Sequence, residues 1–180
     1  GGVRWYIRAS WSHEPAPTPP LAAARSGGVV GVDSHADHLA VAVLDTHGNP
    51  VGSPHRIPLE LAGLPSSTRD ARIREAIAAL IEHTRSNGRV TIVIEDLGFD
   101  TAEKSREKHG RKKAFRALIS GFPTTAFRTR LVSMAATAGI AVVAVDPRYT
   151  SVVGGRDWTP ALHRPHRPAT RHSGAAVAIG

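Results

Sequence analysis

Cysteine is absent from this sequence of 180 residues. Its absence excludes disulfide bonds and every zinc site built on cysteine, and it fits a reducing compartment such as the cytoplasm. No apolar stretch reaches the roughly 18 residues of a membrane span, and the first residues lack the pattern of a signal peptide. We therefore expect a cytoplasmic protein that has neither a membrane nor a zinc ion among its partners.

Acidic residues are also scarce, since 15 Asp and Glu stand against 23 Lys and Arg. The resulting net charge of +8 and isoelectric point of about 11.0 indicate a polyanionic partner, nucleic acid before a membrane surface. Hydrophobic residues make up 41% of the chain, which excludes a disordered protein. The length suits one domain with a full core.

The N-terminal part differs from the rest of the chain. Residues 3–11 alternate in polarity and carry aromatic side chains, which predicts a strand. Because a single strand is not stable alone, we interpret residues 1–11 as the last strand of a truncated upstream β domain. Residues 12–27 are rich in Pro, Ala, Ser and Gly and are predicted to form a linker. The main domain is expected over residues 28–180, truncated within a last helix that begins at Arg171.

Three apolar runs in the main domain are each followed by an acidic residue. Residues 29–32 lead into Asp33, residues 90–94 into Glu95, and residues 140–145 into Asp146. Runs that are apolar at nearly every position suit strands covered on both faces. Residues 39–44 form a further run that pairs with the first as a hairpin, and a third extended piece is expected to start at Val51.

Helical patterns alternate with the later strands. Ser67 and Asp70 match a capping box that opens a helix ending at Asn87-Gly88, and Pro123 fits the first turn of another that ends at Gly139. Residues 154–170 are interpreted as a loop. The order of elements predicts an α/β fold of the ribonuclease H-like type, a mixed five-stranded sheet with helices on both faces.

In that fold the strands before Asp33 and Glu95 are neighbours, about 4.8 Å apart. Two carboxylates at one sheet edge, with a third ligand, can hold two divalent ions about 3.5–4 Å apart. Oxygen ligands favour Mg²⁺ or Mn²⁺. Each acid by itself is better explained as a turn or cap residue, and Asp146 is interpreted as a turn residue. The pair favours a metal site.

The third ligand is expected on the last helix, which contains no acidic residue. His172 is its best-placed group able to bind a metal. The alternative is that His163, His166 and His172 are solvated loop residues or phosphate contacts.

Several segments together resemble the OrfB/TnpB-type proteins of transposons, whose RuvC-like halves are related to type V CRISPR effectors. The resemblance covers residues 28–180 and is most specific at Val145–Ser151. It is carried by the segments Gly31–Asp33, Leu39–Asp45, Gly48–Asn49, Ile92–Leu97, Phe127–Leu131, Gly139–Ser151 and Ala175–Ile179.

The resemblance implies a transposon-associated, RNA-guided DNA endonuclease that hydrolyses phosphodiesters with two metal ions. Asp33 and Glu95 match the first two catalytic acids, and DNA and a guide RNA are the implied partners, in the nucleoid of a prokaryotic cytoplasm. Phosphates are expected to bind a set of basic residues, for which a solvated loop is the equal alternative: Lys104, Arg106, Lys108, Arg111, Lys112, Lys113, Arg128 and Arg130.

Two departures from the family pattern concern activity. The family places a zinc-binding Cys-x-x-Cys pair after the motif that ends at Ser151, and this chain has none. His172 stands where the family has its third acid, so the residues also allow a nuclease-inactive, RNA-guided DNA-binding or regulatory protein of the same family. A third hypothesis, an actin-like sugar kinase or ATPase, expects Gly and Thr after the first Asp, and Ser34–Ala36 gives it little support.

Overall fold

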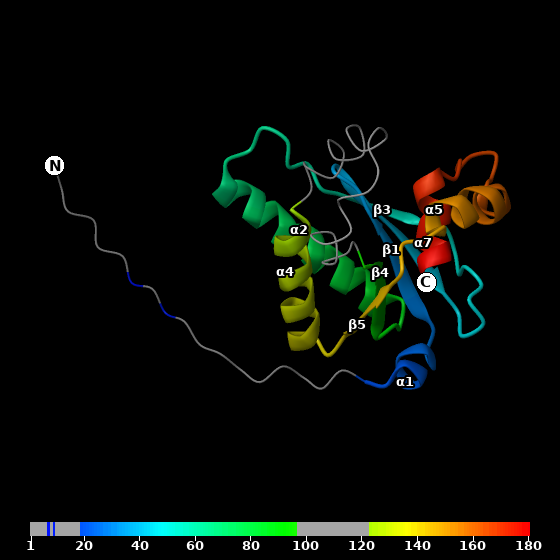
Figure 1. Ribbon diagram of the computed structural model, residues 1–180, viewed down its shortest axis with the longest axis horizontal. Helices are drawn as coiled ribbons and strands as arrows, with labels where there is room; N and C mark the ends of the chain where they lie inside the picture. The colour runs from blue at the N-terminus through cyan, green and yellow to red at the C-terminus, as the bar shows by residue number, and fades with distance from the viewer. Residues whose placement is uncertain (1–6, 8, 10–18, 97–122) are drawn as a thin grey trace, which may run out of the picture.

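The protein is described from a computed structural model, which covers residues 7, 9, 19–96 and 123–180 (Figure 1). Predictions for residues 1–6, 8, 10–18 and 97–122 lie outside the described residues. These include most of the N-terminal strand, residues 12–18 of the linker, and the basic residues from Lys104 to Lys113. The short helix α1 (Leu21–Arg25) falls within the predicted linker, and the carbonyl of Ala24 accepts a hydrogen bond from Thr91.

A five-stranded sheet forms the centre of the molecule, in the order β3-β2-β1-β4-β5. Its strands are β1 (Val29–Ser34), β2 (His38–Leu44), β3 (His55–Pro58), β4 (Thr91–Glu95) and β5 (Ala141–Val145). The first three pair antiparallel, whereas β1–β4 and β4–β5 are parallel. This mixed sheet confirms the predicted ribonuclease H-like fold.

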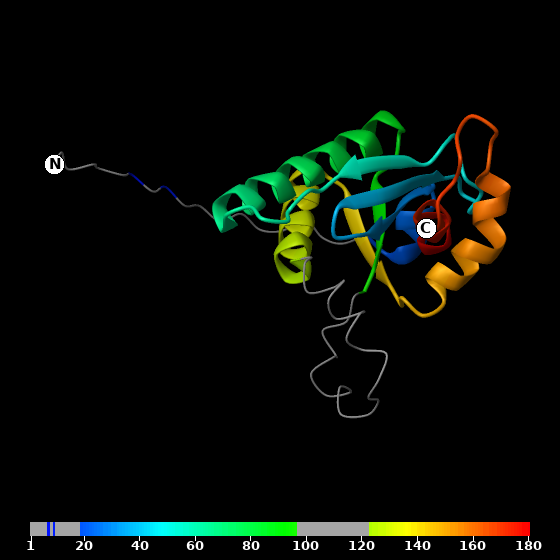
Figure 2. The same cartoon turned by 90° about the horizontal axis from the view of Figure 1, so that it is seen from above.

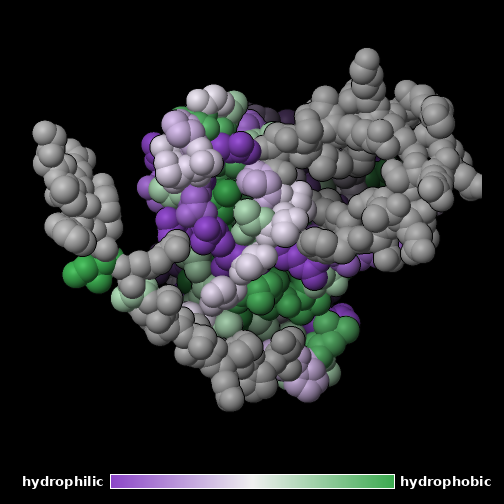
Figure 3. All heavy atoms as spheres, turned by 60° about the vertical axis from the view of Figure 1, so that its left-hand side comes forward, coloured by the Kyte–Doolittle hydropathy of each residue, from purple (hydrophilic) through white to green (hydrophobic). Residues whose placement is uncertain are grey.

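One face of the sheet is covered by α2 (Ser66–Ser86) and α4 (Thr124–Thr137), as seen from above in Figure 2. The alternate residues Val30 and Val32 of β1 and Ile92 and Ile94 of β4 point into this core. The outer surface on this side is largely hydrophilic, with a hydrophobic area below it (Figure 3). None of the helices among the described residues is both long and apolar enough to cross a membrane.

The opposite face is covered by the last helix, α7 (Arg171–Ile179), which packs over β1 and β2. The backbone of α7 approaches its neighbours closely because glycine residues lie at the points of contact. A Cβ atom built on Gly31 would overlap the carbonyl oxygen of Ala176, and one on Gly174 would overlap that of Gly154. The backbone of α7 can therefore lie directly on the central strand.

The prediction of a loop before α7 was wrong in part. Residues 150–162, whose later part we expected to be a loop, form the continuous helical run α5 (Thr150–Val153), η3 (Gly154–Trp158) and α6 (Thr159–Leu162). Gly154 is buried there against Gly174, so its lack of a side chain serves packing and does not end the helix. The part that remains non-helical is residues 163–170.

Two smaller predictions also need correction. Helix α2 begins at Ser66 after Pro65, and its N-cap has no side-chain hydrogen bond. Asp70 is instead engaged by Arg74 and Arg130. The third strand begins at His55, after the turn in which Asp45 accepts the backbone N–H groups of His47 and Asn49.

Candidate active site

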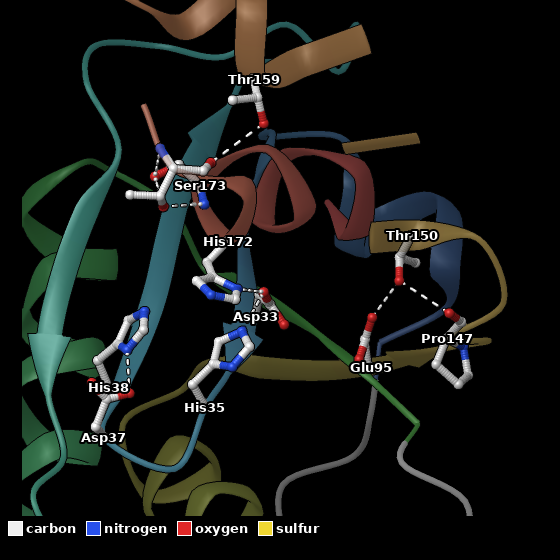
Figure 4. Close-up of polar contacts among 11 residues, drawn as sticks. Asp33, His35, Asp37, His38, Glu95, Pro147, Thr150, Thr159, His172 and Ser173 are labelled. Carbon is white, nitrogen blue, oxygen red and sulfur yellow. Dashed lines mark hydrogen bonds and ion pairs between the residues drawn. The ribbon is translucent and has the colours of Figure 1, made fainter. Parts of the chain in front are cut away.

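Asp33 and Glu95 lie on neighbouring strands at the same end of the sheet. Val32 of β1 pairs in parallel with Ile94 of β4, so the residue after each one occupies the next register position. Because successive side chains on a strand point to opposite faces, and Val32 and Ile94 face α2 and α4, both acids face α7. The structure thus brings the two predicted acids to one rim and one face of the sheet (Figure 4).

Asp33 is buried, with 5% of its surface exposed, and its carboxylate is approached by two imidazoles. Nε2 of His35 lies 2.9 Å from Oδ2, and Nδ1 of His172 lies 3.4 Å from the same oxygen. The two imidazole rings have centroids 3.6 Å apart. Helix α7 therefore delivers His172 to Asp33, as the sequence predicted, whereas His35 was not predicted.

His172 is placed by the start of α7. Thr170 caps the helix by accepting the backbone N–H of Ser173, whose own hydroxyl accepts the backbone N–H of Thr170. This reciprocal pair satisfies two amides that the helix itself leaves unbonded, and it fixes the turn that carries His172. His163 and His166 are exposed in the preceding loop, as the solvated alternative predicted for them.

His35 is held by the tight hairpin between β1 and β2. Its backbone N–H bonds the carbonyl of His38 at 2.8 Å, and its ring stacks on that of His38 with centroids 5.1 Å apart. His38 is in turn fixed by Asp37 at 2.7 Å, and Asp37 by Arg56 at 2.8 Å. The hydrogen bond from His38 lowers the pKa of Asp37. A chain of polar contacts thus supports His35 from the solvent side.

Glu95 is oriented by Thr150 of α5, whose hydroxyl donates a hydrogen bond to Oε1. The same hydroxyl lies 3.0 Å from the carbonyl of Pro147. Tyr149, just before it, has φ of 68°, a left-handed conformation that is uncommon for a residue other than glycine. Local backbone strain of this kind is found where a neighbouring group must be placed accurately, and here that group is Thr150.

Charges in the site influence one another. Burial raises the pKa of Glu95, against the opposing hydrogen bond from Thr150, and the negative charge of Asp33 raises it further. The hydrogen bond to Asp33 raises the pKa of His35, whereas burial and then the charge of His35 lower that of His172. The pKa of His35 is thus held above the ordinary value of an imidazole, and that of His172 below it. Asp33 and Glu95 place two carboxylates at one rim of the sheet, an arrangement that can bind a divalent cation.

The ligand atoms of Asp33, His35 and His172 all lie within 4.8 Å of one another, and within the described part of the chain they form the sole cluster of this kind. Glu95 lies outside the cluster, and it interacts electrostatically with Asp33. Asp146 points away to an exposed pair with Arg148 and accepts that residue's backbone N–H, as expected of a turn residue.

The two described members of the predicted phosphate-binding set are on α4. Arg128 contacts Asp96, the residue after Glu95, at 3.1 Å, and Arg130 pairs with Asp70 of α2. Their positive charges are thus partly compensated within the protein, and their role in binding phosphate stays a prediction.

Neither a model of a known family nor a curated protein matches this sequence. Solved structures do share its fold. RuvC of T. thermophilus bound to a Holliday junction substrate is similar over 85% of this chain and 89% of its own, with 16% identity and a TM-score of 0.53. A second Thermus thermophilus RuvC structure covers 84% and 90%, with 17% identity and a TM-score of 0.51.

A Cas12f1–sgRNA–target DNA complex is also similar, with 14% identity and a TM-score of 0.50. The match covers 85% of this chain and 48% of the Cas12f1 chain, so this chain spans about half of that protein. At these identities the comparisons establish the fold. It is the ribonuclease H-like fold in its RuvC form.

Proposed function

We propose that this chain is the RuvC-like catalytic part of a TnpB-type, RNA-guided DNA endonuclease. It cleaves phosphodiester bonds with divalent metal ions held by Asp33, Glu95 and His172. The observation that carries the proposal is the placement of Asp33 and Glu95 on adjacent parallel strands, facing α7, with His172 of that helix 3.4 Å from Asp33. Asp33 and His172 are thus in contact, and Glu95 lies on the strand next to that of Asp33.

The residues fit the metal ions that such chemistry uses. Carboxylate oxygens suit Mg²⁺ or Mn²⁺, and Asp33 and Glu95 supply two carboxylates from neighbouring strands. When bound, the ions activate water and stabilise the leaving oxygen. Thr150 holds the Glu95 carboxylate in one orientation, and the burial of Asp33 keeps bulk water from competing for it.

Nucleic acid is the proposed substrate because of charge close to the site. The loop before His172 and the first residue of α7 carry the exposed residues Arg164, Arg167 and Arg171, and cations near a catalytic site attract and orient phosphates. The fold similarity to RuvC with a Holliday junction and to Cas12f1 with sgRNA and target DNA supports the same substrate class. Guidance by RNA is the finer part of the proposal and rests on the sequence resemblance.

One observation favours a second candidate, a nuclease-inactive DNA- or RNA-binding protein. The third ligand position holds an imidazole, and Asp33 is already in contact with two imidazoles. A protein of this kind would bind nucleic acid through its basic surface without cutting it.

The test is Mn²⁺-dependent cleavage of single-stranded DNA by the full chain. Asp33→Asn and Glu95→Gln keep the shape of each side chain and remove its charge, so both should lose at least about a hundredfold in rate. Asp146→Asn is the matched control, since Asp146 also follows a parallel strand but faces solvent, and it should cleave like the wild type. Equal cleavage by the wild type and Asp33→Asn would overturn the proposal. Binding of DNA without cleavage by the wild type would support the second candidate.

A further inference from the structure

His35 is the one residue of the Asp33 cluster that the proposed mechanism does not use. Its Nε2 atom points at the Asp33 oxygen that Nδ1 of His172 also faces, at 2.9 and 3.4 Å (Figure 4). A single imidazole would be enough to give that oxygen a hydrogen bond. Two imidazoles directed at one buried oxygen suit three groups that bind a common ion.

The distances between the ligand atoms of the three residues agree with a single ion bound between them. Ligand atoms about 2.0–2.2 Å from a common ion lie roughly 3–4.4 Å from one another, depending on the coordination angle. The atoms of Asp33, His35 and His172 lie within 4.8 Å of one another, which is close to this range. Asp33, 5% exposed, supplies a negative charge that is shielded from water and well suited to a cation.

His35 also has the outer support that metal ligands need. Ligand imidazoles are oriented by contacts outside the metal site, and His35 is held by the hairpin and by the ring of His38. His38 is not one of the three residues of this cluster. Its Nδ1 atom contacts Asp37, and its ring lies beside those of His35 and His172, at 5.1 and 5.4 Å between centroids.

We propose that Asp33, His35 and His172 bind one divalent ion, and that His35 makes this site prefer a first-row transition metal such as Mn²⁺ over Mg²⁺. The inference rests on the proposed function and deepens it by naming the class of metal. Two nitrogen ligands and one oxygen ligand suit transition metals, whereas Mg²⁺ requires oxygen ligands and retains its water. Replacing one nitrogen by oxygen should therefore reverse the preference.

The experiment measures metal binding by the full 180-residue chain, separately from activity. Co²⁺ serves as a spectroscopic probe through its visible absorption, and calorimetry gives the affinities for Mn²⁺ and Mg²⁺. His35→Gln should weaken Co²⁺ and Mn²⁺ binding at least about tenfold and leave Mg²⁺ binding within about threefold. His47→Gln, the matched control at an exposed histidine in the turn after β2, should bind all three ions like the wild type.

A second variant separates a ligand from a merely structural residue. His35→Asp offers an oxygen in place of a nitrogen, so it should bind Mg²⁺ more tightly than the wild type and shift the Co²⁺ spectrum. Circular dichroism establishes that each variant is folded. The inference is overturned if His35→Gln keeps the wild-type Co²⁺ spectrum and affinity. It is equally overturned if the wild type binds Mg²⁺ as tightly as Mn²⁺, or if His35→Asp leaves the preference unchanged.

Failure of this inference and failure of the proposed function give different results. A chain that binds Co²⁺ through His35 but cuts no DNA retains the metal site and loses the nuclease. A chain that cuts DNA equally well with Mg²⁺ or Mn²⁺, and whose His35→Gln variant binds Co²⁺ unchanged, retains the nuclease and loses the role of His35.

Discussion

Nδ1 of His172 lies 3.4 Å from Oδ2 of Asp33, although the two residues are far apart in the sequence. The contact depends on how closely α7 lies on β1. Gly31 allows that approach on the strand side, and the cap formed by Thr170 and Ser173 fixes the turn of helix that carries the imidazole. The packing of α7 on β1 and the contact between Asp33 and His172 thus depend on the same few residues.

Gly31→Ala should disturb the site without touching any of its polar groups. The added methyl group would overlap the carbonyl oxygen of Ala176, so α7 must move away from β1. Overpacking of this kind costs about 1–3 kcal/mol, and the displacement should also weaken metal binding at Asp33. Urea unfolding and Co²⁺ titration measure the two effects. Gly27→Ala is the control, because a Cβ atom there meets no atom within 4 Å; equal stability and metal affinity in the two variants would contradict the packing account.

Thr150→Val removes the hydroxyl that bonds Glu95 and keeps the shape of the side chain. That hydrogen bond opposes the effect of burial on Glu95, so its loss should raise the pKa of Glu95 further. Carbon NMR of the metal-free protein, titrated between about pH 4 and pH 8 around the usual carboxyl range, measures this pKa. Thr137→Val removes a hydroxyl bonded to a backbone carbonyl on α4 and should leave the Glu95 pKa unchanged. A Glu95 pKa that stays constant in Thr150→Val would mean that Thr150 does not stabilise the charged carboxylate.

His83 should make the protein less stable in mild acid. Its ring stacks on that of His55 with centroids 4.7 Å apart, and burial followed by the charge of His55 lowers its pKa in the folded state. The unfolded chain therefore binds more protons between the folded pKa and the unfolded value of about 6.5. The contribution of neutral His83 to folding stability is complete above about pH 6.5, and it is lost as the pH falls through the pKa of His83 in the folded state.

The measurement is the urea midpoint at about pH 5 and about pH 7.5, on either side of the unfolded value. His83→Gln should reduce the loss of stability at the lower pH. The raised pKa of His35 acts in the opposite direction in both proteins. The quantity compared is therefore the change in urea midpoint between the two pH values, in the wild type and in the variant. The same loss in both proteins would show that His83 does not contribute to it.

The sequence allowed four of the five strands to be predicted because these are apolar at nearly every position, whereas β3 (His55–Pro58) is not. It also allowed Asp33 and Glu95 to be placed together, since each follows such a strand and parallel strands end at one edge. The start of β3 and of α2 could not be located accurately. Tertiary packing, rather than a capping box, decides where α2 begins, because Asp70 is drawn to Arg74 and Arg130.

His35 and Thr150 were missed for different reasons. His35 lies in the turn just after β1, where the alternation of side chains along a strand does not determine which way a side chain points. Thr150 had no signal in the sequence, since its helix was only recognisable once the packing of Gly154 on Gly174 was known. Pairs of glycines that allow close packing are not distinguishable in a sequence from glycines that end helices.

The central claim is that Asp33, Glu95 and His172 bind divalent ions at one rim of the sheet. Anomalous scattering at the manganese edge, from crystals of the chain grown with Mn²⁺, tests it most directly. The account predicts an anomalous peak within bonding distance of the Asp33 carboxylate and of an imidazole nitrogen of His172, with Glu95 bound to the same ion or to a second one beside it. Crystals with no peak at Asp33, and with Glu95 directed away from it, would contradict the account.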